Sequence, residues 1–135
     1  MLLDDIADYL STQGVGTVAT DLFKSIMPDA PDDCIALFES GGHDPLHTMG
    51  AQAGQAVLER PTLQVLCRSS RYDSARALAL QVDQVLNGAR DLTINGISYQ
   101  WIVARHPPIQ LGRDANNRHE ISCNYDIARE MATSS

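Results

Sequence analysis

The chain has 135 residues and a formal net charge of −7, with 44% hydrophobic and 20% charged residues. This length and composition are typical of a soluble globular protein, so we expect residues 1–135 to form one domain around a single core. The acidic balance argues against a protein that grips nucleic acid through its phosphates, because such proteins need a basic face.

Two further features bear on where the protein is found. No apolar run is long enough to span a membrane, and the first residues lack the basic start and unbroken apolar run of a signal peptide. We therefore expect a cytoplasmic product with no membrane partner. Cys34, Cys67 and Cys123 lie in apolar, strand-like segments without a C-x-x-C pair. They predict buried, reduced thiols rather than a disulfide framework or a zinc site.

The first part of the chain predicts one helix followed by extended segments. Apolar residues at three- and four-residue steps indicate a helix over 2–13 that ends at Gly14. Strand-favouring residues then predict a strand near 17–26. After a turn rich in proline and aspartate, the apolar run at 34–38 predicts a strand near 33–39 that is buried on both faces.

Residues 39–58 are rich in glycine and hold no regular period, so we expect a long polar loop. His43, Asp44 and His47 lie close together there, and two imidazoles with a carboxylate could bind a metal. A loop without a fixed scaffold makes a poor metal site, so we favour a solvated loop. We predict no metal and no cofactor.

The stretch from Arg60 to Gly88 is the centre of the predicted fold, because a strand there feeds an amphipathic helix. Alternating residues predict a strand near 61–68 with one wholly apolar face. Apolar steps of three and four residues then predict a helix over 71–87.

The ends and the outer face of this helix carry three signals. Ser70 followed by Asp73 is typical of a capping-box start, and Gly88 favours the left-handed conformation that ends a helix. Leu80 lies nearly opposite the apolar stripe. It is either a scattered surface residue or a contact point for another chain, and the pattern leaves both readings open.

The last third of the chain predicts antiparallel strands. Asn95-Gly96 is a strong two-residue turn between strands near 91–95 and 97–105. Residues 106–118 predict a second exposed polar loop. The final segment, 118–127, alternates apolar and polar side chains, which predicts a strand with one buried and one wet face.

The sequence carries no catalytic constellation. The GVGTVA segment at 14–19 follows a helix, whereas dinucleotide binding needs such a segment between a strand and a helix. No G-K-[ST] and no G-x-S-x-G occurs. Cys123 and His119 are most simply interpreted as neighbours on one strand face rather than as a nucleophile and its base. We therefore predict that the protein is not an enzyme.

Five segments of the chain resemble the tail terminator, or minor capsid, proteins of long-tailed bacteriophages. They read PDDCIALFESGG at 31–42, ERPTLQVLCRS at 59–69, YDSARAL at 72–78, NGISY at 95–99 and PPIQLGRDANNRHEISCNY at 107–125. Their order and spacing carry the resemblance over most of the chain after residue 30. The first thirty residues match only in general plan.

The resemblance implies an α+β fold, a single domain with a mixed, largely antiparallel sheet flanked by helices. It implies a homo-oligomer, a six-subunit ring that caps the tail tube protein, stops tube growth and offers a joining surface to the head–tail connector protein. The protein would belong to the tail or neck of the virion and be made in the host cytoplasm. DNA would pass through the lumen without specific binding, and no enzymatic activity is implied.

A closed ring needs two different, matching faces on each subunit. We predict that arginines near strand ends and loops contribute to them, because the planar guanidinium makes several directed bonds. The predicted interface residues are Arg60, Arg68, Arg71, Leu80, Arg113 and Arg118. The alternatives are a head-side connector or completion protein and, from the His43–His47 loop alone, a small metal-dependent enzyme.

Overall fold

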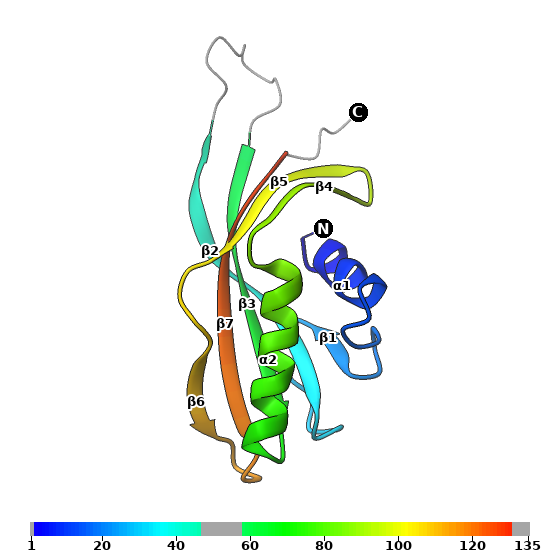
Figure 1. Cartoon of the computed structure of the whole chain (residues 1–135), viewed down its shortest axis with the longest axis vertical. Coiled ribbons are helices and arrows are strands. Elements are labelled where there is room, and N and C mark those ends of the chain that lie inside the picture. Colours follow the sequence, from blue (N-terminus) through cyan, green and yellow to red (C-terminus); the bar gives the residue numbers. More distant parts are fainter. Residues whose placement is uncertain (1, 47–57, 131–135) are drawn as a thin grey trace.

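A long, twisted sheet with two helices packed against it makes up residues 2–46 and 58–130, the part of the chain that the computed structural model describes (Figure 1). In chain order the elements are α1 (Leu2–Thr12), β1 (Leu22–Lys24), β2 (Cys34–Leu46), β3 (Leu58–Ser69), α2 (Tyr72–Leu86), β4 (Ala89–Ile94), β5 (Ile97–Ala104), β6 (Ile109–Arg113) and β7 (His119–Glu130). No helix within the described ranges is long and apolar enough to cross a membrane.

The seven strands form one sheet in the order β1-β2-β3-β7-β5-β4. Strand β6 lies off this path and pairs with the first half of β7, whereas β5 pairs with its second half. Among the described strand pairs, only β1 and β2 run parallel. The structure therefore confirms the expected α+β fold with a mixed, largely antiparallel sheet.

The core lies between the helices and one face of the sheet. Leu63, Val65 and Cys67 of β3 are fully buried, as their alternation predicts. They share one apolar cluster with the inward stripes of both helices, represented by Ile6 of α1 and Val82 of α2. The three cysteines are buried and free, which confirms the predicted thiols.

The end of α2 was correctly predicted, but its start was not. Gly88 has φ +84°, the left-handed conformation expected after the helix. At the start, Arg71 occupies the N-cap position without a side-chain capping bond, so Ser70 and Asp73 form no capping box. The preceding residue, Ser69, does the local bonding instead: its hydroxyl donates to Asp33 Oδ1 at 2.6 Å and accepts from the Arg71 N–H at 3.3 Å.

The predicted turn at Asn95-Gly96 is confirmed, with φ angles of +50° and +80° that fit a two-residue hairpin turn. The strand that leaves this turn, β5, does not alternate strictly between buried and exposed side chains. A register shift between Tyr99 and Trp101 places Tyr99 and Ile102 in the core and leaves Val103 exposed. One extra residue in a strand moves every later side chain to the other face.

Two strand boundaries and one predicted loop also differ from the predictions. The predicted strand near 17–26 shortens to Leu22–Lys24, because the Thr17 carbonyl accepts backbone N–H bonds from residues 20, 21 and 22 and closes a turn. Strand β2 continues through 39–46, where a loop was predicted. The predicted loop at 106–118 contains β6, which bonds to β7.

A partly buried polar network ties α1 to the sheet. The Tyr99 hydroxyl donates to Asp5 Oδ2 at 2.6 Å, and Asn95 Nδ2 donates to Asp5 Oδ1 at 2.9 Å. Arg129 Nη1 donates to the Tyr99 oxygen at 3.1 Å, while its Nε donates to Glu59 at 2.8 Å. This network fixes the position of α1, and with it the cavity that α1 forms with β1 and β2.

Candidate functional site

The six predicted interface residues fall into three groups by burial. Arg68 and Arg118 are buried within the subunit, and Arg71, Leu80 and Arg113 are exposed. Arg60, in β3 opposite His43 of β2, is half-buried and already makes an interaction within the subunit. The structure thus separates residues that hold the subunit together from residues that a partner could reach.

Arg68 fastens the 28–33 turn to β3. Arg68 follows the buried Cys67 in β3 and is itself 2% exposed. The Nη2 group donates to the Pro31 carbonyl at 2.6 Å, and Nε donates to the Asp32 carbonyl at 3.2 Å. Because these bonds engage the guanidinium within its own subunit, we leave Arg68 out of the proposed interface.

Arg118 plays a similar part for the turn before β7. Its side chain is 7% exposed and forms ion pairs with Asp29, Asp32 and Asp114 at 3.0, 3.3 and 2.8 Å. Its backbone N–H also bonds to Asp114 Oδ1, which is the main reason that the pKa of Asp114 lies below its ordinary value, against the opposing effect of burial. Arg118 thus joins its own turn to Asp32 and Asp29, which lie 86 and 89 positions away in the chain, so we leave it out as well.

The exposed group lies at the surface of α2 and at the end of β6. Leu80 projects from α2 with 46% of its surface exposed, which confirms that it lies off the apolar stripe. Arg71 is exposed at the N-terminus of the same helix. Arg113 is exposed and spends one donor on Asn117 Oδ1, at 3.0 Å. An arginine has five N–H donors, so four remain for a partner.

Sequence reasoning missed the most apolar exposed element, strand β6. Ile109 and Leu111 are 47% and 56% exposed. Within the described residues β6 pairs on one side only, with β7, and Figure 1 shows its other side at the margin of the sheet. An unpaired strand edge with exposed apolar side chains is a template for another chain. Pro107-Pro108 before it and Gly112 within it hide the strand signal.

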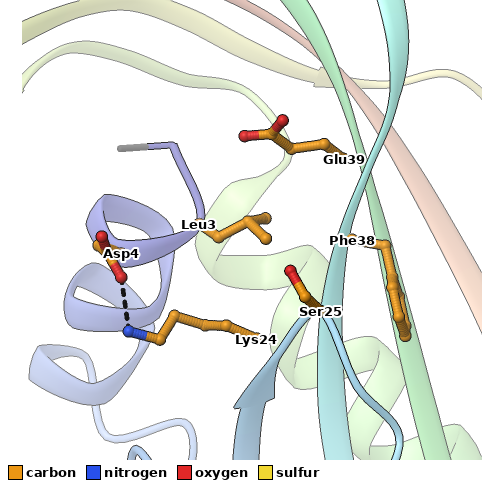
Figure 2. A pocket seen from close by; sticks show the side chains of 6 residues that line it. All are labelled: Leu3, Asp4, Lys24, Ser25, Phe38 and Glu39. Carbon is orange, nitrogen blue, oxygen red and sulfur yellow. Dashed lines mark hydrogen bonds and ion pairs between the residues drawn. The ribbon is translucent and has the colours of Figure 1, made fainter.

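A cavity of about 340 Å³ opens between α1, β1 and β2 (Figure 2). Its lining residues are Leu3, Asp4, Lys24, Ser25, Phe38 and Glu39. Lys24 Nζ donates to Asp4 Oδ1 at 2.5 Å across one side, while Glu39 projects toward the cavity from β2 without an ion pair among the described residues. Apolar Leu3 and Phe38 with a free carboxylate suit an amphipathic or basic group.

A second cavity, of about 310 Å³, lies beside the break between β5 and β6. Its lining residues are Asp83, Asn87, Ala104, His106, Pro107 and Pro108. Since the Pro107 carbonyl can only accept, His106 Nδ1 donates to it, at 2.8 Å, and Nε2 accepts from Asn124 Nδ2 at 3.0 Å. Both ring nitrogens therefore make hydrogen bonds within the subunit.

The remaining candidates for chemistry are the cysteines and the metal-ligating side chains. Cys34, Cys67 and Cys123 are buried in the sheet. No group of three or more metal-ligating side chains is found among residues 2–46 and 58–130. The loop considered as a metal site reaches past this range: His43 and Asp44 belong to β2, and His47 lies outside the described residues.

Comparison with known proteins gives one family match and a match of fold. The sequence model of the family described as bacteriophage tail terminator protein matches residues 9–131. No relative matches among curated proteins. A solved chain from the virion of a native gene transfer agent particle superposes with a TM-score of 0.62, at 16% identity, over 96% of this chain and 95% of that one. A second solved chain superposes with a TM-score of 0.49 at 18% identity, over 93% and 89% of the two chains.

Proposed function

Because the chain belongs to the bacteriophage tail terminator protein family, we propose that it forms a six-subunit ring that caps the tail tube, stops its growth and presents a joining surface to the head–tail connector. Membership confirms the resemblance predicted from the sequence. A tail terminator is a structural component, so membership also confirms that the chain is not an enzyme.

The observation that carries the proposal is the family match, which spans residues 9–131 and so includes nearly every described element. The solved chain that shares the fold comes from a gene transfer agent virion. We infer that this chain is a virion component as well, and we assign it to the junction of tail and head on the strength of the family match. In this place its partners would be the tail tube protein on one side of the ring and the connector protein on the other.

Several exposed side chains of the subunit are available for contacts with neighbouring subunits. Arg71 and Leu80 on α2 and Arg113 on β6 are exposed, and Arg60 completes the set on β3. A ring also needs different faces that match, and these residues lie on separate elements. The net charge of −7 is compatible with a lumen that lets DNA pass without capturing it.

Tail length tests this function directly. Tails assembled without the protein should grow beyond their normal length and fail to join heads, and supplying the wild-type protein should restore one length. Electron microscopy of negatively stained lysates measures both. Tails of normal length that still fail to join heads would favour the head-side connector instead. Normal tails with heads attached would contradict the proposed function.

A further inference from the structure

We propose that β6 of one subunit docks on the open edge of β2 in a second copy of the chain, with its apolar side chains at the cavity beside α1. This contact rests on the ring of the proposed function and names the two surfaces that close it. Four observations support the contact: the unpaired edge of β6, the unpaired edge of β2, the cavity beside α1 and the complementary charge of the two surfaces.

The receiving edge arises because β1 is short. Strand β1 pairs with β2 only at residues 35–37, and the last bond runs from the Ser25 N–H to the Leu37 carbonyl at 2.8 Å. Ser25 has φ +64°, and the chain turns away from β2 there. Beyond Leu37, β2 pairs with β3 on one side, and no described strand pairs with its other side.

The cavity lies where β1 ends and the β2 edge becomes open. Figure 2 shows Leu3 of α1 between Lys24 and Glu39, next to Ser25. A strand added to β2 in line with β1 would cover this cavity and place a side chain into it. Its volume, about 340 Å³, is in the range of small binding pockets. Because Leu3 and Phe38 line the cavity beside Glu39, a fitting occupant is an extended segment that carries both apolar and basic side chains.

Strand β6 has that character. It is extended, unpaired on its outer side among the described strands, and exposes Ile109 and Leu111. Exposed sheet edges commonly bind by adding a strand, with backbone bonds giving affinity and side-chain pockets giving specificity. Residues 105–113 hold two arginines, one histidine and no carboxylate, whereas the cavity carries Glu39 and the Asp4–Lys24 pair.

Charge therefore selects a second copy as the occupant. Arg113, at the end of β6, supplies the cation that Glu39 lacks within its own subunit. The two surfaces also lie at opposite margins of the sheet. Strand β6 pairs with β7 at one margin, and the open edge of β2 lies at the other. One subunit can thus give β6 to one neighbour and receive it from another. Such a head-to-tail contact closes into a ring when the rotation repeats.

Cross-linking tests the contact on the assembled cap. Single variants Glu39→Cys and Leu111→Cys are bound to purified tail tubes, separately and mixed, and treated with a short bis-maleimide. A linked dimer is expected in the mixture, and the chain with both changes should give a ladder up to the whole ring. Each single variant alone should give none. A mixture of Glu39→Cys with Leu80→Cys is the matched control, and wild type checks that the buried cysteines stay unreactive.

Charge exchange tests the same pair without a linker. Arg113→Glu and Glu39→Arg should each lower the yield of rings by at least about tenfold, because each sets like charges together. The double variant should recover most of the yield.

The outcomes separate the contact from the function. Rings that form without a 39–111 link, or charge changes that do not rescue each other, would overturn the contact and leave the terminator function intact. Links from residue 111 to the tube or connector protein would also overturn it. A wild-type protein that forms no ring on tubes would overturn both.

Discussion

The phenol of Tyr99 donates a 2.6 Å hydrogen bond to the carboxylate of Asp5, and both residues are buried between α1 and the sheet. The pair joins residues 94 positions apart. Burial is the main cause that raises the pKa of Tyr99, with the bond to Asp5 adding to it, so the phenol stays protonated and remains a donor. Helix α1, which forms one wall of the cavity, is held by this bond.

Replacing Tyr99 by Phe should lower the free energy of unfolding by about 1–3 kcal/mol, because a buried carboxylate loses a donor. Asn95 still donates to Asp5, which favours the lower end of this range. Urea unfolding measures the change. Tyr9→Phe is the control, since Tyr9 is half-buried and its hydroxyl makes no hydrogen bond among the described residues. Equal stability of the two variants would contradict the role given to the Tyr99 bond.

The Asp114–Arg118 turn before β7 should make the free energy of unfolding depend on pH in the acidic range. The Arg118 N–H holds the pKa of Asp114 below its usual value against the effect of burial, with further help from the Arg118 guanidinium and the Asn116 N–H. A carboxylate with a lowered pKa stabilises the fold above its unfolded pKa of about 3.9, and this contribution is lost as pH falls through the folded pKa.

Asp114→Asn should therefore be less stable than wild type at neutral pH, and the difference should shrink below about pH 4. Melting temperatures measured from pH 7 down to pH 2.5 provide the test. Asp91→Asn, which changes an exposed carboxylate in β4, serves as the control. A difference between Asp114→Asn and wild type that stays constant over this range would show that the carboxylate charge is not what stabilises the turn.

The proposed interface predicts that charge reversal separates assembly from folding. Arg60→Glu, Arg71→Glu and Arg113→Glu should each keep the circular dichroism spectrum of the wild type and lose the ring. Leaving a buried opposite charge unpaired typically costs about 2–5 kcal/mol per contact, and a ring repeats the loss at every interface. Mass photometry reports the ring, and Arg90→Glu in β4 is the control. If all three variants still form rings and complete tails, this placement of the interface is wrong.

Local pattern was enough to predict most of the fold. The alternation of Leu63, Val65 and Cys67, the helix stop at Gly88 and the turn at Asn95-Gly96 depend on neighbours in the chain, and the structure confirms each. The missed strand, β6, is five residues long, mostly exposed, and preceded by two prolines. Its order comes from pairing with β7, which no local pattern reveals.

The candidate surface was harder to predict, because the sequence does not distinguish an arginine that binds its own subunit from one that binds a partner. Arg118 finds Asp29, 89 positions away in the chain, and Arg68 finds the Pro31 carbonyl, 37 positions away. The aspartate-rich 29–33 segment was the available signal, since it could neutralise buried cations. The exposed apolar residues of β6 carried no such signal, because their exposure depends on which edge of the sheet stays open.

The mass of the complex at the end of a tail tube tests the central claim most directly. Tubes capped with the wild-type protein are dissociated gently, and native mass spectrometry measures the released cap. We predict a closed assembly with six times the 14.7 kDa mass of the chain. Release of single chains only, under conditions in which a covalently linked ring stays intact, would contradict the account.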